Sequence, residues 1–173
     1  MHDALTCPGC AAPAQAFGPH DHDLCAADAM TRAEQVLADG GHRLTPVRKA
    51  TLQILLRAHR ALGAYDVLDQ LAQGGFGNQP PVAYRALEFL EEHGLAHRIR
   101  RLNAFAACMH PGEAHAPAFL ICRGCNHVAE APAAAVGIAL TQAAAGIGFA
   151  IERSTVEVLG LCPSCQVQVQ VPA

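Results

Sequence analysis

Residues 120–125 read Leu-Ile-Cys-Arg-Gly-Cys, and residues 160–165 read Gly-Leu-Cys-Pro-Ser-Cys. Each stretch holds one Cys-x-x-Cys pair, with 36 residues between the pairs, and the four cysteines are Cys122, Cys125, Cys162 and Cys165. Four thiolates from two such pairs are typical of a closed, tetrahedral structural zinc site. Such a site would fasten a hairpin to the end of the chain and stabilise a small core. A redox-active or disulfide pair is the alternative, but nothing around the cysteines resembles a thioredoxin-like βαβ unit.

A second set of metal-type side chains combines nitrogen, sulfur and oxygen donors, and its members are His97, Cys108, His115 and Glu130. Imidazole with one thiolate favours zinc over the harder donor sets that iron and manganese prefer. The alternative is that the histidines are surface residues and Cys108 packs as a small hydrophobe. His110 is a competing ligand two residues from Cys108, whereas His127 is expected to be a surface residue.

Length and composition limit the possible protein classes. A chain of 173 residues suits one domain or two small ones, and a 5% aromatic content predicts a thin core. No run approaches the roughly 18 apolar residues of a membrane helix, and no signal peptide is recognisable. We therefore expect a cytoplasmic protein without a membrane segment, in which eight cysteines indicate metal or redox chemistry.

The net charge of −3 conceals a basic middle segment. Residues 32–101 hold ten of the 12 Lys and Arg residues against seven acidic residues. This excess is weak support for a polyanionic partner, because small excesses are also common on solvated surfaces.

Residues 1–30 are expected to form a flexible leader, because they are rich in Pro, Ala, His and Asp and show no clear period. The leader also contains Cys7, Cys10, His20, His22 and Cys25, so an additional metal site is the alternative.

The next segment, residues 31–109, is predicted to be a winged helix-turn-helix. Thr45 and Pro46 mark a helix start, with Thr45 as its N-cap. The inner face of that helix is predicted to comprise Val47, Thr51, Ile54, Leu55 and Ala58. Two strands over 95–101 and 104–108, turning at Asn103, would form the wing. The four predicted helices span residues 31–38, 46–58, 64–73 and 80–93.

A hinge loop over residues 110–116 would lead into a small C-terminal α/β domain, residues 117–173. Its predicted elements are a hairpin over 118–121 and 127–130, a helix over 132–145 and a strand over 149–159. This half is too small to bury its sheet alone, so we expect a homodimer formed through the sheet. The fold class is therefore α+β.

Several motifs occur together in the order of a known family. Arg43-Leu-Thr-Pro-x-Arg48, Ala64-Tyr-Asp66, Pro80-Pro-x-x-Tyr-Arg-Ala-Leu87 and the Cys-x-x-Cys pairs resemble the ferric uptake regulator family over residues 31–167. Iron- and peroxide-sensing members usually carry a His-rich run before the first pair. Here residues 113–122 contain one histidine, which resembles the zinc-sensing branch, as does the sequence of residues 160–165. Val82-Ala83 departs from the common Thr-Val and lacks its hydroxyl.

The resemblance implies a zinc-responsive, dimeric transcriptional repressor of zinc-uptake genes that binds double-stranded DNA at an AT-rich inverted repeat. It implies two Zn²⁺ ions per subunit, a structural one on the four cysteines and a regulatory one on the mixed-donor set. Tyr65, Tyr84 and Arg85 are the candidate DNA-binding residues, with Arg85 placed to reach base edges or phosphate. Further phosphate contacts are expected from Arg43, Arg48, Arg98, Arg100 and Arg101.

Other functions remain open on the sequence alone. An iron, manganese or peroxide sensor would share the fold. We do not expect an enzyme, because no further acid/base pair accompanies the ligands, but a zinc enzyme or thiol oxidoreductase is the alternative from another class. A metal buffer or chaperone that uses the leader is a third alternative.

Overall fold

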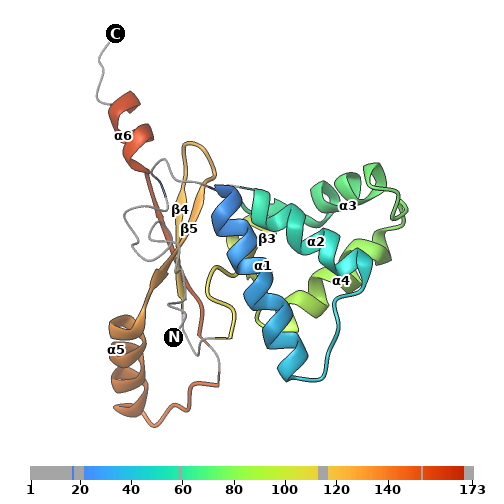
Figure 1. The fold of residues 1–173 in the computed structure, drawn as a ribbon. Helices are drawn as coiled ribbons and strands as arrows, with labels where there is room; N and C mark the ends of the chain where they lie inside the picture. Colours follow the sequence, from blue (N-terminus) through green and yellow to red (C-terminus); the bar gives the residue numbers. More distant parts are fainter. Residues whose placement is uncertain (1–16, 18–21, 59, 113–116, 153, 170–173) are drawn as a thin grey trace, which may run out of the picture. The chain divides into compact units, whose positions relative to one another are not determined.

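The computed structural model describes residue 17 and residues 22–58, 60–112, 117–152 and 154–169. The chain divides into two compact units, Met1–Gly112 and Glu113–Ala173. None of the helices in the described part of the chain is long and apolar enough to span a membrane. The mixture of helix and sheet agrees with the predicted α+β class (Figure 1).

Over its described residues, the first unit contains four α-helices and a three-stranded antiparallel sheet. The strand order is β1-β3-β2, so the two wing strands pair directly and β1 adds a third strand that the sequence did not predict. Asn103 occupies the left-handed turn of the wing at φ 46°, as predicted. The elements are α1 His22–Asp39, α2 Pro46–Arg57, β1 Leu62–Gly63, α3 Ala64–Gln73, α4 Pro80–Glu92, β2 Ala96–Ile99, a 3₁₀ turn Arg100–Leu102 and β3 Ala104–Ala107.

Helix starts and ends in this unit follow from local sequence. Pro46 and Pro80 occupy the first turns of α2 and α4, where the missing N–H costs no hydrogen bond. Asp66 accepts a hydrogen bond from the Gly63 N–H at 3.1 Å and so caps α3. Thr45 stands at the N-cap of α2 in an extended conformation, but its side chain makes no capping bond. Thr45 is therefore the N-cap residue, as predicted, but without a side-chain cap.

The core of the first unit is formed mainly by leucines from α2, α3 and α4. On α2, the inner face is centred on Thr51, Leu52, Leu55 and Leu56, so the predicted stripe was displaced around the helix. Thr51 tolerates burial because its hydroxyl donates to the Val47 carbonyl at 2.8 Å. The fully buried leucines include Leu52, Leu71, Leu87, Leu90 and Leu95.

Helix α1 begins much earlier than predicted. It has 18 residues and starts at His22, inside the expected flexible leader. Ala29, Ala33 and Leu37 are buried at helical spacing. Alanine contributes little to an apolar period, which is why the sequence concealed this face. The predicted helix start at residue 31 and the leader boundary at residue 30 were both wrong.

Residues of α1 form one ion pair within the helix and one with α2. Arg32 pairs with Asp28 along the helix at 2.6 Å, and Lys49 of α2 pairs with Glu34 at 2.6 Å.

Cys7, Cys10 and His20 of the predicted leader lie outside the described residues.

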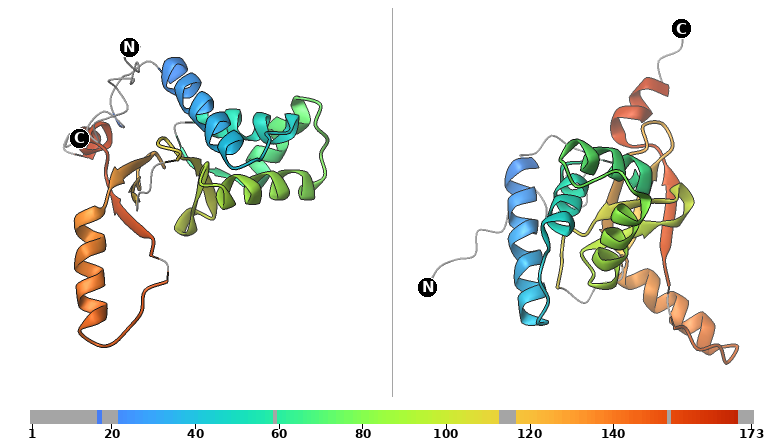
Figure 2. Two further views of the ribbon diagram at one scale, coloured as in Figure 1. Left: turned by 60° about the horizontal axis from the view of Figure 1, so that its bottom comes forward. Right: turned by 90° about the vertical axis from the view of Figure 1, so that its right-hand side faces the viewer.

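In the part of the second unit that the structure describes, a three-stranded sheet has a helix toward each end (Figure 2). The sheet order is β5-β4-β6, with β4 antiparallel to β5 and parallel to β6. The strand predicted over 149–159 was too long, because β6 covers only five residues, and α6 was not predicted. The elements are β4 Pro117–Cys122, β5 Val128–Pro132, α5 Ala134–Ala145, β6 Val156–Gly160 and α6 Pro163–Val169.

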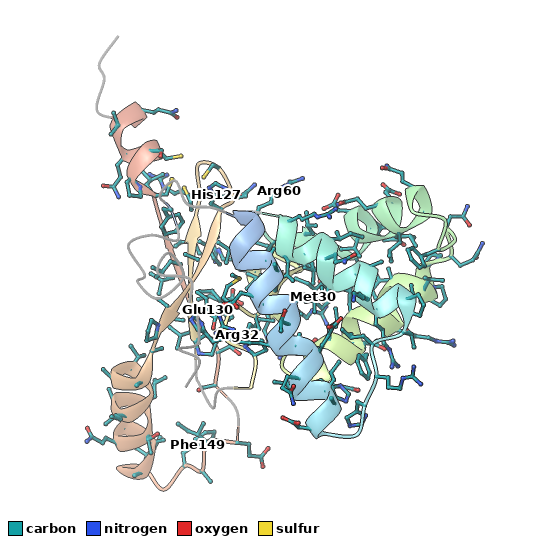
Figure 3. The ribbon with its side chains drawn as sticks, in the orientation of Figure 1. Met30, Arg32, Arg60, His127, Glu130 and Phe149 are labelled. Carbon is teal, nitrogen blue, oxygen red and sulfur yellow. The ribbon has the colours of Figure 1, made fainter. Side chains whose placement is uncertain are left out.

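Large apolar side chains of the second unit are exposed on α5, on the segment that follows it and on β6. Within the described chain, no residue of α5 is buried. Ile138 is 60% exposed and Phe149, labelled in Figure 3, is 64% exposed. Exposed apolar residues in this number are typical of a surface that binds another molecule. They are Val136, Ile138, Leu140, Ile147, Phe149, Ile151, Val158 and Leu159.

Candidate metal centres and nucleic-acid interface

The strand register brings the two cysteine pairs together. Cys122 ends β4 and lies opposite Gly160 of β6 in the parallel pairing. Both strands therefore lead into their Cys-x-x-Cys turns at the same end of the sheet. The Sγ atoms of Cys122, Cys125, Cys162 and Cys165 all lie within 4.8 Å of one another. The structure therefore groups the four cysteines that the sequence predicted as one structural site.

The geometry of this cluster fits zinc. Tetrahedral zinc with Zn–S bonds of about 2.3 Å places its sulfurs about 3.8 Å apart. The Cys125 and Cys162 sulfurs are 3.7 Å apart. Cys122 and Cys162 are buried, Cys165 is half-buried and Cys125 is exposed. Such a site is closed by four thiolates, which is the structural and not the catalytic arrangement.

Backbone groups favour a thiolate at the centre of the cluster. Burial opposes ionisation of Cys122, but the N–H groups of Cys162, Cys125 and Gly124 lower its pKa to about 6. The Cys162 N–H lies 3.3 Å from the Cys122 sulfur. Hydrogen bonds with the Cys162 and Cys122 thiols raise the pKa of Cys165 to about 12. Neighbouring sulfurs cannot all ionise together unless a cation compensates their charge.

The mixed-donor residues are distributed over both units. His97 lies on β2, and Cys108 directly follows β3, where its N–H donates to the Leu95 carbonyl at 3.0 Å. The side chains of His97 and Cys108 bring a ring nitrogen and a sulfur within 4.8 Å of each other. Cys108 is 2% exposed.

The two remaining residues of the predicted set belong to the second unit. Glu130 lies on β5, paired with Phe119 of β4, and is half-buried (Figure 3). His115 lies outside the described residues. The structure thus brings together the wing residues His97 and Cys108 within the first unit.

The three candidate DNA-binding residues are exposed. Tyr84 and Arg85 lie in the N-terminal half of α4, and Tyr65 lies in the first turn of α3. Tyr65 is 64% exposed and Tyr84 is 41% exposed, so both rings are available to a partner. Tyr84 and Arg85 thus lie on the exposed face of α4, as the predicted contact of Arg85 with DNA requires.

Two arginines that were expected to contact phosphate have partners within the protein. Arg98 donates to Asn103 at 2.9 Å and lies 5.7 Å from the centroid of the Phe105 ring. Arg48 lies over the Phe89 ring, with 3.5 Å from its Cζ atom to the centroid. Sequence reasoning did not identify Phe89 as a partner, because residues 48 and 89 meet only through tertiary packing.

No protein-family model matches the chain. Over 137 residues, however, it is 35% identical to the zinc uptake regulation protein of Escherichia coli (strain K12). This match covers 79% of this chain and 80% of the relative. A zinc uptake regulator complexed with zinc and DNA superposes with a TM-score of 0.78 at 34% identity, covering 84% of this chain and 97% of that one. The crystal structure of holo XcZur superposes with a TM-score of 0.73 at 34% identity, and the match covers 85% of this chain and 99% of that one. The chain therefore belongs to the zinc uptake regulator branch of the ferric uptake regulator family.

Proposed function

We propose that this chain is a zinc-sensing transcriptional repressor of zinc-uptake genes, which binds an AT-rich inverted-repeat operator as a dimer. The observation that carries the proposal is the His97–Cys108 pair at the wing of a unit whose exposed helix presents Tyr84 and Arg85. The relatives named above include a regulator complexed with both zinc and DNA. This function class agrees with the one that the sequence motifs predicted.

Each subunit is proposed to bind two zinc ions. The four clustered cysteines would hold a structural ion, since their spacing already fits a tetrahedral site. His97 and Cys108, together with His115 and Glu130, would hold the regulatory ion. A zinc ion held by all four residues would join ligands that belong to different units.

The regulatory ligands would couple zinc supply to DNA affinity. His97 and Cys108 are fixed to the wing strands, whereas Glu130 is fixed to β5 of the other unit. A shared ion would therefore restrict how the two recognition helices of a dimer are spaced. Shifting a population from 1:99 to 99:1 requires about 5.5 kcal/mol of differential affinity, so losing one ligand can remove the response.

Helix α4 is proposed to approach DNA through its N-terminal half. Arg85 would contact base edges or phosphate there, and Tyr84 would pack on sugar or a thymine methyl group. Glu88 and Glu92 are exposed further along the helix and would repel phosphate. The acidic C-terminal half is therefore expected to tilt away from the duplex.

The exposed apolar surface of α5 and β6 supports dimerisation of the second unit. An uncovered surface of this kind is unfavourable in water, and a second copy would bury it. A two-fold dimer would also present two recognition helices to an inverted repeat, because its symmetry matches that of the operator.

A zinc titration of operator binding, with metal content measured in parallel, tests the proposal. Cys108→Ser is expected to abolish zinc-dependent binding while the protein remains a folded dimer that retains its structural zinc. Unchanged operator binding by Cys108→Ser would contradict the assignment of the regulatory site.

The same titration with other ions tests the alternative function. We expect Fe²⁺, Mn²⁺ and peroxide treatment to be much less effective than Zn²⁺ in changing operator affinity, because the donor set includes thiolate and imidazole. A response to iron, manganese or peroxide at concentrations where zinc has no effect would favour another sensor of the same fold.

A further inference from the structure

We infer that Arg48 is a positioning residue for helix α4, holding it through the Phe89 ring, and not a contact to DNA phosphate. The sequence motif places Arg48 among exposed arginines of a basic segment, so a phosphate contact is the natural expectation. The structure instead gives its guanidinium an aromatic partner. The inference rests on the proposed DNA-binding function and adds a role that α4 needs to perform it.

Phe89 lies between Arg48 and His93. The Arg48 Cζ atom is 3.5 Å from the Phe89 centroid, and the His93 ring is stacked on Phe89 at 4.0 Å with 29° between the planes. Two groups this close cannot share one face of a ring, so they occupy opposite faces. His42 packs edge-on to His93 at 4.4 Å and to Phe89 at 6.4 Å. We call Arg48, Phe89, His93 and His42 the Phe89 stack.

The Phe89 stack joins three separate segments of the first unit. Arg48 lies in the first turn of α2, His42 lies in the α1–α2 connection, and Phe89 lies in the C-terminal half of α4. His93 caps the end of α4, where its Nδ1 atom is 2.8 Å from the Phe89 carbonyl oxygen. The stack therefore fixes the C-terminal end of α4 to the start of α2.

The Arg48 guanidinium depends on this ring. Arg48 is half-buried, and among the described residues no carboxylate forms an ion pair with it. Phe89 is 8% exposed, so the ring face is largely shielded from water. Cation–π attraction is stronger where the partners are desolvated, and it falls off when the guanidinium leaves the ring. Moving Arg48 outward to a phosphate would abandon this contact.

The other end of α4 carries Tyr84 and Arg85. Arg85 is four residues before Phe89, about one helical turn away. Side chains of a binding site must be held within about 0.5 Å and 10–20° of their productive position and orientation. A tilt of α4 at the Phe89 stack would therefore displace Tyr84 and Arg85, the side chains proposed to contact DNA.

Salt dependence separates the two roles of Arg48. Each phosphate contact releases counterions, so removing one lowers the slope of log affinity against log salt by about 1. Removing a positioning residue weakens binding but leaves the number of phosphate contacts, and hence the slope, unchanged. A purely structural residue would lower the melting temperature without changing the affinity of the folded protein.

The test uses the full chain with zinc, well below its melting temperature, at several salt concentrations. The variants are Arg48→Met, Phe89→Leu, their double variant and Arg48→Lys. We expect Arg48→Met and Phe89→Leu each to weaken operator binding roughly three- to tenfold, with an unchanged salt slope. The double variant should bind the operator about as tightly as the single variant with the lower affinity, because both substitutions remove the same contact. Arg48→Lys should restore part of the affinity.

Arg57→Met is the matched control, because Arg57 is an exposed arginine in the last turn of the same helix. It removes the same charge without removing a ring contact. A drop of about 1 in the salt slope of Arg48→Met, additive losses in the double variant, or unchanged affinity would each overturn the inference. If the unsubstituted protein shows no zinc-dependent operator binding, the proposed function itself fails, and the inference fails with it.

Discussion

At the residue scale, Gly124 decides whether the cysteine cluster can close. A Cβ atom built at Gly124 would lie 2.9 Å from the Cys165 sulfur and 3.2 Å from the Cys165 Cβ. Separations this short would force the second cysteine pair away from the first. The glycine of Cys122-Arg-Gly-Cys125 is therefore needed for close approach, whereas the sequence motif alone assigns it no role.

We predict that Gly124→Ala weakens zinc retention by the second unit. The added methyl group should displace Cys165 from the tetrahedral arrangement, so zinc should transfer faster to a competing chelator. Gly137→Ala is the control, because nothing lies within 4 Å of a Cβ at that position of α5. The control should keep its zinc and gain up to about 1 kcal/mol of helix stability. Equal zinc retention by both variants would contradict the close-approach argument.

Arg85 should behave differently from Arg48. If Arg85 contacts DNA directly, Arg85→Gln should weaken operator binding and lower the salt slope by about 1 when the contact is to phosphate. If the contact is to a base edge, the loss should be about 1–3 kcal/mol and should fall mainly on one operator position. Binding measured across salt concentrations and single-base operator variants distinguishes the two. An Arg85→Gln variant with the affinity of the unsubstituted protein would exclude Arg85 from the interface.

At the element scale, α1 shows the limit of reading helices from periodicity. Helices α2, α3 and α4 were predicted because leucines and prolines mark their faces and starts. Helix α1 was predicted only from residue 31, since its earlier buried positions are alanines. Strand β6 was overpredicted because Phe149 and Ile151 are apolar, but both residues are exposed and precede the strand, which begins at Val156. Burial of alanines revealed the start of α1, and pairing with β4 from Val156 onward set the length of β6, so hydropathy alone decided neither case.

The extension of α1 predicts a contrast between two neighbouring alanines. Ala29 is 2% exposed, whereas Ala27 is exposed on the same helix. Ala29→Asp should lower the free energy of unfolding by more than about 2 kcal/mol, because it buries an unpaired charge. Ala27→Asp should change it by less than about 0.5 kcal/mol. Denaturant unfolding of both variants measures the difference, and equal values would place residue 29 outside the core.

At the scale of the whole molecule, the exposed apolar surface of the second unit determines the expected assembly. Ile138 lies on α5 and is 60% exposed, and Gln142 is exposed one turn later. We predict that Ile138→Glu shifts the protein from dimer toward monomer, because it introduces a charge into the surface proposed to be buried. Gln142→Glu adds the same charge to the same helix at a polar position and should have a smaller effect.

Sedimentation equilibrium of both variants measures this effect. Operator binding should fall together with dimer content, since two recognition helices must bind one inverted repeat. A monomeric Ile138→Glu variant that still binds the operator with full affinity would show that dimerisation is not required.

The sequence by itself indicated the family and the α+β class, and it singled out the four cysteines that the fold clusters. These features are local: a Cys-x-x-Cys turn, a proline at a helix start and a left-handed Asn103 each depend on residues close together in the chain. The sequence also nominated His97 and Cys108, which the fold brings within 4.8 Å.

Tertiary structure decided what depends on residues distant in sequence. The parallel register of β4 and β6 brings the two cysteine pairs to one end of the sheet, and Gly124 allows their close approach. Helix α1 packs partly through alanines, which the apolar periodicity of the sequence did not reveal. The same applies to Arg48. Its motif predicted a contact with DNA phosphate, whereas the fold packs its guanidinium on the Phe89 ring. Its role depends on a ring 41 positions further along the chain, and only packing could bring the two together.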